Sequence, residues 1–212
     1  MATAPGDGID LLAPYLGHQR VSEPAGPEVS EDVSLVRAAQ NGDRTAFGHL
    51  YQRYARMVHG ILLAKVPLSE VNDLVQDVFL LALRRLATLR EAGRFGAWLA
   101  AIARNRASDY HRHSLPEDPV LDDDNFTAEL GYGNASGHPE DLATRILDLI
   151  KSLPEAYRET LILRLVEGMT GPEIAARIGI THGSVRVNLH RGMQLLRAKL
   201  SPTKQRSEQE TP

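Results

Sequence analysis

The chain has 212 residues, of which 42% are hydrophobic, and a formal net charge of −3. This length suits one or two domains, and the apolar content is sufficient for packed cores. The sequence contains no cysteine, which excludes disulfide bonds and thiolate zinc sites. No stretch approaches the roughly 18 apolar residues of a membrane-spanning helix, and the N-terminus lacks a basic lead before an apolar run. We therefore expect a cytoplasmic protein without direct membrane insertion.

The first 30 residues are rich in Gly, Pro and Ala, a composition typical of a disordered N-terminal extension. A first helical block is predicted over residues 31–113. Its first helix should end at Asn41-Gly42, and apolar residues then recur at helical spacing up to Pro67.

The same block continues with two further predicted helices. Ser69 is predicted to cap the third helix, and a loop over residues 88–93 precedes a fourth helix with an aromatic and aliphatic face. Loops this short are typical of a compact helical bundle.

Residues 114–139 hold Pro, Gly, Asn and Asp with scattered apolar residues, which predicts a flexible linker. Acidic residues are frequent here, and Lys and Arg are absent. Because this linker contributes much of the negative charge, the flanking helical blocks are more basic than the whole chain.

A second helical block is predicted over residues 140–200, followed by a flexible tail over 201–212. The segment from Ser152 to Glu155 has the capping-box pattern S-x-x-E, and the segment from Thr170 to Glu173 repeats it. Gly179 then supplies the turn between two short helices, and Thr181 is predicted to cap the second one. This spacing is that of a helix-turn-helix.

The second helix of this motif has a basic outer face. No Asp or Glu occurs between Thr181 and Lys199, whereas a merely solvated face usually mixes both signs. Arg can bind a guanine edge or a phosphate, and Asn can pair with adenine. An ordinary helical hairpin with a basic solvated side is the alternative interpretation. The predicted DNA-reading residues are Ser184, Arg186, Val187, Asn188, His190 and Arg191.

A polar face on the third helix carries Asp73, Gln76 and Asp77, with the two carboxylates one turn apart. Three interpretations are open: a metal or acid–base site such as that of a metal-dependent phosphodiesterase, a solvated surface, or a docking face for a basic partner protein. Like charges at this spacing are mutually destabilising, and a basic partner would compensate for that cost.

The fourth helix combines basic and aromatic residues, which is typical of nucleic-acid contact, although Trp98 also fits a core position. The candidate DNA residues are Arg94, Arg104, Asn105, Arg106 and Arg112. No phosphate-binding glycine loop, nucleophile elbow or H-E-x-x-H motif is present. We therefore expect no catalytic residues, no metal and no cofactor.

Residues 31–200 resemble bacterial RNA polymerase sigma factors of the extracytoplasmic function (ECF) type. The segment DLVQDVFL, residues 73–80, is similar to the family motif that docks on the clamp helices of the polymerase β′ subunit. The resemblance implies that core polymerase is contacted by Asp73, Leu74, Gln76, Asp77 and Phe79.

Two further segments carry the resemblance. Residues 95–105 resemble the pattern F-x-x-W-L-x-x-I-A-R-N, which implies that the basic residues of the fourth helix recognise and open the −10 element. Residues 153–191 are similar to the second domain of the family, which reads the −35 element. The chain departs from the family pattern in two places. It has Ala100-Ala101 where family members often have Tyr-Arg. It has Ser184 and Asn188 where they often have Thr and a basic residue.

The resemblance implies an all-α protein of two small helical domains, sigma region 2 over residues 31–113 and region 4 over 140–200, joined by the flexible acidic linker. The implied partners are RNA polymerase core, through the β′ clamp helices and the β flap, promoter DNA, and an anti-sigma factor as a further candidate. The expected function is promoter-specific initiation without catalysis. The alternatives are a stand-alone helix-turn-helix regulator and an adaptor that acts through protein contacts alone.

Overall fold

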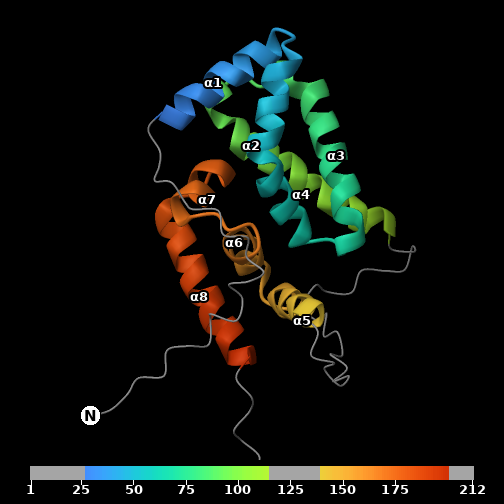
Figure 1. Cartoon of the computed structure of the whole chain (residues 1–212), viewed down its shortest axis with the longest axis vertical. Helices are drawn as coiled ribbons and strands as arrows, with labels where there is room; N and C mark the ends of the chain where they lie inside the picture. Colours follow the sequence, from blue (N-terminus) through green and yellow to red (C-terminus); the bar gives the residue numbers. More distant parts are fainter. Residues whose placement is uncertain (1–26, 115–138, 201–212) are drawn as a thin grey trace, which may run out of the picture.

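The computed structural model describes residues 27–114 and 139–200, and in these residues the regular elements are all helices (Figure 1). We call residues 27–114 the first block and residues 139–200 the second block. Three predicted segments lie outside the described residues: most of the N-terminal extension, the linker except for its two end residues, and the tail. The helices are α1 (Pro27–Gln40), α2 (Arg44–Leu63), α3 (Leu68–Arg85), η2 (Leu86–Thr88), η3 (Ala92–Arg94), α4 (Phe95–Ser114), α5 (Pro139–Lys151), α6 (Glu155–Leu165), α7 (Gly171–Ile178) and α8 (His182–Leu200).

Helix α2 is the centre of the first block and packs against α1, α3 and α4. It begins at Asp43, whose carboxylate accepts hydrogen bonds from the backbone amides of Thr45 and Ala46, a standard N-cap arrangement. Its inner face is apolar over its whole length, so the helix is buried along one side. The fully buried large side chains that it contributes are Leu50, Met57, Ile61 and Leu62.

Two predicted helix caps are wrong. The hydroxyl of Ser69 donates to Glu70 inside α3, and the hydroxyl of Ser152 donates to the carbonyl of Leu149 at the end of α5. Helices α3 and α6 instead begin after Pro67 and Pro154, which make no side-chain cap bond. Proline fixes its own φ at about −65°, which is also a helical value, and both helices begin after it without a side-chain cap.

The helix-turn-helix of the second block is confirmed. Thr170 and Glu173 form both bonds of the predicted capping box at the start of α7. Gly179 ends α7 in the left-handed region, with φ of 74°, and the hydroxyl of Thr181 accepts from the amide of Ser184 in the first turn of α8. Local sequence signals therefore determine where both helices begin and where the first ends.

The variant Gly179→Ala is expected to lower the free energy of unfolding by about 1–2 kcal/mol, because a residue with a β-carbon is strained in the left-handed region. A β-carbon at this position would also lie 2.6 Å from Cβ of Ala97 in α4. Chemical unfolding followed by circular dichroism measures the loss. The control Gly183→Ala lies in α8 with its nearest neighbour at 3.8 Å and should keep or raise stability; equal losses for both variants would contradict the explanation.

The two blocks pack against each other, which the sequence did not predict. Helices α6 and α7 contact α2, and α7 also contacts α4, while α3 and α8 lie on opposite sides of the molecule (Figure 1). Leu161, Ile162 and Leu163 of α6 are fully buried and belong to the same apolar cluster as the core of the first block. We call the packing of α6 and α7 on α2 and α4 the interblock contact.

Candidate functional site

The predicted docking face of α3 is divided between exposed and buried side chains. Asp73 and Gln76 are exposed, whereas Leu74 and Phe79 are only 8% and 4% exposed. The ring of Phe79 lies 4.5 Å from that of Tyr51, centroid to centroid, so it fixes α3 on α2. The polar half of the motif is thus available to a partner, and its apolar half holds the helix in place.

Asp77 is half-buried and forms an ion pair of 2.5 Å with Arg106 of α4. The sequence assigned these two residues to different partners, the first to polymerase and the second to DNA. In the structure they fix α3 to α4. Either side chain can therefore reach an external partner only by sharing or breaking this pair.

The remaining candidate DNA residues of α4 and the turn before it differ in accessibility. Arg94 pairs with Glu91 at 2.8 Å, with its side chain 75% exposed, and Arg112 pairs with Asp109 within α4. Such pairs between exposed side chains contribute little stability, so both arginines can exchange these carboxylates for phosphates. Asn105 is exposed.

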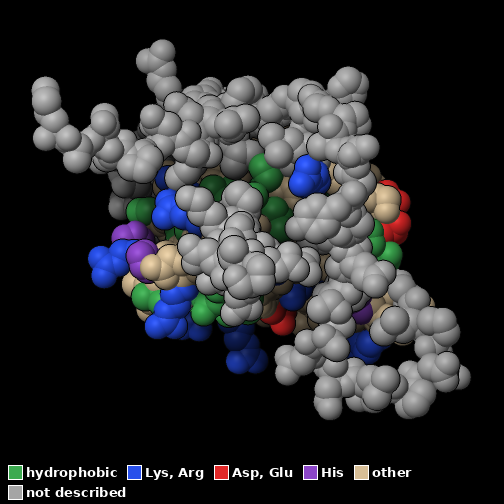
Figure 2. All heavy atoms as spheres, turned by 90° about the horizontal axis from the view of Figure 1, so that it is seen from below, with side chains coloured by type: hydrophobic (Ala, Val, Ile, Leu, Met, Phe, Trp, Pro, Cys, Tyr) green, Lys and Arg blue, Asp and Glu red, His purple; other side chains and the backbone are tan. Residues whose placement is uncertain are grey.

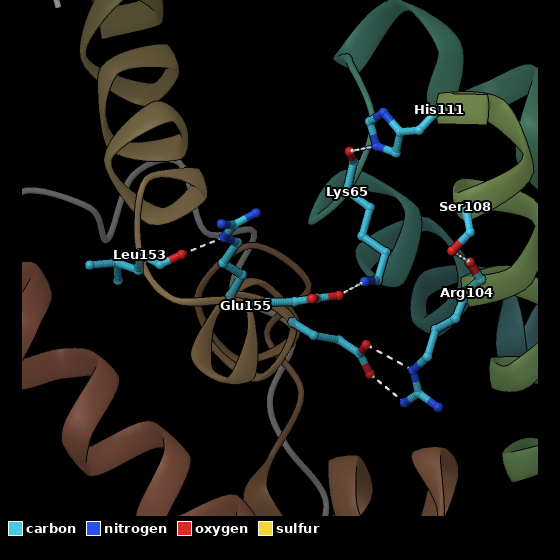
Figure 3. Close-up of polar contacts among 8 residues, drawn as sticks. Lys65, Arg104, Ser108, His111, Leu153 and Glu155 are labelled. Atoms are coloured by element: carbon cyan, nitrogen blue, oxygen red, sulfur yellow. Dashed lines mark hydrogen bonds and ion pairs between the residues drawn. The ribbon is translucent and has the colours of Figure 1, made fainter. Parts of the chain in front are cut away.

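Arg104 is the exception, because it lies in the interblock contact. Its guanidinium donates two hydrogen bonds to Glu159 of α6, at 3.0 and 2.6 Å (Figure 3). Hydrogen bonding to the Glu159 carboxylate raises the pKa of Arg104 despite its partial burial. A bidentate pair of this kind is geometrically specific, and a phosphate would have to displace the Glu159 carboxylate.

Trp98 occupies the interior side of α4. It is only partly buried but packs against the core cluster, and its ring lies 5.8 Å from that of Phe95, which is 1% exposed. The core interpretation of Trp98 therefore fits its surroundings in this structure.

The basic face of α8 is open. Ser184, Arg186, Val187, His190 and Arg191 are exposed and Asn188 is half-exposed. Val185, Gly192 and Leu196 lie on the opposite side and are buried. Among the described residues, neither Arg186 nor Arg191 takes part in an ion pair. Figure 2 shows Lys, Arg and His side chains gathered at the left edge of the view, the side on which Figure 1 places α8.

Several residues at the interblock contact had no recognisable signal in the sequence. A cavity of about 120 Å³ lies beside Arg104, and its walls carry charges of both signs. Lys65 pairs there with Glu155 (Figure 3), and this pairing lowers the pKa of Glu155. The partners are separated by 90 positions in the chain, so no local pattern could have joined them. The lining residues are Ala64, Lys65, Arg104, Glu155, Arg158 and Glu159.

Comparison with known proteins identifies two sigma-factor regions. The family model described as Sigma-70 region 2 matches residues 50–114, and the one described as Sigma-70, region 4 matches residues 143–196. These ranges contain the α3 face, α4 and the basic face of α8. No described helix combines the length and apolar character needed to cross a membrane.

Similar proteins of the same class cover most of the chain. It is 33% identical over 181 residues to the ECF RNA polymerase sigma-E factor of Escherichia coli (strain K12), covering 81% of this chain and 95% of that one. It is 32% identical over 179 residues to the ECF RNA polymerase sigma factor BldN of Streptomyces coelicolor, covering 80% and 66%. The chain belongs to the ECF family of RNA polymerase sigma factors.

A solved structure has the same fold. The structure of CnrH in complex with the cytosolic domain of CnrY superposes with a TM-score of 0.56 at 26% sequence identity, covering 80% of this chain and 97% of that chain. The all-α architecture with sigma regions 2 and 4 is thereby confirmed, and a stand-alone regulator is not favoured.

Proposed function

We propose that this sigma factor binds its partners through three separate surfaces. The exposed residues Asp73 and Gln76 on α3 contact the β′ clamp helices of core polymerase, with Asp77 joining them when its pair with Arg106 is shared. Helix α4 and the turn before it bind the −10 element. The open face of α8 reads the −35 element, and the second block also meets the β flap.

The observation that carries this proposal is the charge separation on the two exposed faces. The α3 face presents the exposed carboxylate of Asp73, whereas α8 presents Arg186 and Arg191, which form no ion pair with the described residues, on a helix without an acidic residue. A carboxylate face is repelled by DNA phosphates and suits a basic protein surface, whereas a basic face attracts phosphates. The two surfaces therefore suit different partners at the same time.

The proposed role requires no catalysis by this chain. Opening DNA means unstacking base pairs at about 1.4 kcal/mol per step, and a small helical domain alone supplies little of that free energy. When two DNA-reading blocks are tethered to one large enzyme, binding of the first block raises the effective concentration of the second at the DNA. The combined binding free energy of the two blocks can then offset the cost of opening the DNA. Because the partners are polymerase and chromosomal DNA, the proposed place of action is the cytoplasm, and an anti-sigma factor is a further proposed partner.

Run-off transcription tests the proposal. Purified bacterial core polymerase is incubated with fragmented genomic DNA of the source organism, with and without this protein, and the transcript starts are sequenced. New starts that share two upstream elements at fixed spacing are expected. If the protein binds polymerase and DNA and no new starts occur, the proposed function is wrong.

A further inference from the structure

Residues 86–94, which join α3 to α4, form a basic and open segment of the first block, and we call them the connecting segment. Its only acid is Glu91, which pairs with Arg94 at 2.8 Å. This segment is the turn before α4 to which we assign contact with the −10 element. The exposed arginines of the segment and of the last turn of α3 are Arg84, Arg85, Arg90 and Arg94.

Apolar side chains attach the connecting segment to the core at every third residue. Leu86 and Phe95, at its two ends, are 2% and 1% exposed. Leu89 and Ala92, between them, are partly buried against the same core. The segment contains the 3-10 helices η2 and η3, and three residues is the period of such a helix. The arginines of the segment lie between these anchors, on the solvent side.

Gln40, the last residue of α1, holds the backbone of the connecting segment. Its side-chain amide donates to the carbonyl of Leu86 at 3.0 Å and to the carbonyl of Leu89 at 2.8 Å. The nitrogen of a side-chain amide carries two N–H donors, so both are used. The carbonyl of Leu86 also accepts from the amide of Leu89, at 3.1 Å. One side chain thus spans η2, although it lies 46 and 49 positions earlier in the chain.

The backbone of Gln40 is itself well fixed. Val36 and Ala39, in the last turns of α1, are 0% and 8% exposed. The chain then turns back at once, because the amide of Asp43 donates to the carbonyl of Ala38 at 3.0 Å and the carboxylate of Asp43 caps α2. Helix α1 also contacts η2 and η3. Gln40 therefore presents its amide to the connecting segment from a rigid support.

The placement of the connecting segment matters more for reading bases than for attracting DNA. Attraction between arginines and phosphates carries no sequence information. Hydrogen bonds to base edges require a defined geometry, and a loop gives such geometry only where a rigid element supports it. Loss of the two hydrogen bonds from Gln40 would leave every arginine in the chain but would release the backbone that carries them. General DNA affinity and sequence discrimination should therefore respond differently.

We propose that Gln40 is a positioning residue for the −10 element. Its two hydrogen bonds hold the connecting segment in the geometry with which Arg90, Arg94 and the adjoining backbone discriminate between sequences. Gln40 does not contact DNA in this arrangement and acts through the segment alone. This inference rests on the proposed function, from which it takes the ligand of the segment.

Two variants remove the hydrogen bonds in different ways. Gln40→Met removes both donors and keeps a side chain of similar length and helix propensity. Gln40→Glu keeps the shape of the side chain, but an ionised carboxylate only accepts hydrogen bonds. The matched control is Gln52→Met, which makes the same change at an exposed position of α2. Circular dichroism verifies that the three variants keep the helical content of the wild type.

Hydrogen–deuterium exchange of the full chain, without polymerase or DNA, is the first measurement. Peptides that cover the connecting segment are expected to exchange about tenfold faster in both Gln40 variants, because a local opening that breaks fewer hydrogen bonds is less costly. Peptides from the middle of α2 and from α8 should exchange as in the wild type. The control Gln52→Met should leave the exchange of the connecting segment unchanged.

The second measurement uses a promoter found by the run-off experiment. The reconstituted holoenzyme is bound to this duplex and to duplexes in which only the upstream or only the downstream shared element is scrambled. Both Gln40 variants are expected to lose about tenfold in discrimination at the downstream element, which is the order of one specific base contact. Discrimination at the upstream element and affinity for core polymerase should stay within about twofold of the wild type, as should every value for Gln52→Met.

Arginine variants test whether the effect passes through the connecting segment. The double variant Arg90→Ala with Arg94→Ala should reduce downstream discrimination in the wild-type background. It should add little in the Gln40→Met background, because residues that act through one another are not additive. Full additivity would overturn the proposal. Unchanged exchange in both Gln40 variants would overturn it too, as would faster exchange with unchanged downstream discrimination.

A merely structural role of Gln40 gives a different pattern, in which discrimination at both elements and polymerase affinity are lost together, and this result also overturns the proposal. If the run-off experiment yields no shared elements, the proposed function is wrong, and promoter reading by the connecting segment is wrong with it. If shared elements occur and the Gln40 variants behave like Gln52→Met, the proposed function stands and the positioning role fails.

Discussion

Removing both exposed arginines of α8, in the double variant Arg186→Ala with Arg191→Ala, is expected to abolish discrimination at the −35 element. An arginine that contacts a base edge or a positioning phosphate contributes about 1–3 kcal/mol. The two side chains share no partner, so their contributions should add, giving a loss of about 2–6 kcal/mol. Competition between a promoter duplex and the same duplex with a scrambled −35 element, bound by the reconstituted holoenzyme, measures this loss.

The matched control is Arg197→Ala, which removes the same charge from the same helix. Arg197 is also exposed, but at 1.5 Å per residue it lies about 16 Å further along the helix than Arg186 and about 9 Å further than Arg191. Residues near the start of a recognition helix reach the bases, so this control should stay within about 0.5 kcal/mol of wild type. If Arg197→Ala costs as much as the double variant, α8 binds DNA through its total charge rather than by reading an element.

The helix-turn-helix was predictable because its signals act within a few residues. A capping box joins Thr170 to Glu173 across one turn, and Gly179 ends the helix through its own backbone conformation. The same reasoning was wrong at Ser69 and Ser152, where a neighbouring proline begins the helix without a side-chain bond. Propensity and pattern thus identify the helices more reliably than they identify the group that caps them.

The interblock contact was not predictable, because its partners are far apart in the chain and individually ordinary. Arg104 and Glu159 are separated by 55 positions, and each reads as a charged residue on a helix surface. Gly60 reads as an unfavourable residue in a helix, although it marks where α6 packs. A resemblance based on motifs indicates which surfaces bind external partners. It does not indicate which of these surfaces pack against another part of the same chain, as Arg104 does against Glu159.

The charge reversal Asp73→Arg is expected to weaken binding to core polymerase at least about a hundredfold. Asp73 is exposed on the α3 face, and like charges brought together at an interface cost several kcal/mol. Each 1.4 kcal/mol is a factor of ten in affinity. Unlike Asp77, which holds Arg106, Asp73 shares no ion pair with the described residues. Its loss should therefore leave the fold intact, as circular dichroism can verify.

The neighbouring substitution Asn72→Arg is the control, since it adds the same side chain about 100° further round the helix. Asn72 is also exposed, so the two variants differ mainly in the direction of the new charge. Fluorescence competition against the labelled wild-type protein should show near-normal polymerase affinity for Asn72→Arg and a large loss for Asp73→Arg. Equal losses would mean that polymerase responds to the overall charge of α3, and no loss in either would place the docking surface elsewhere on the protein.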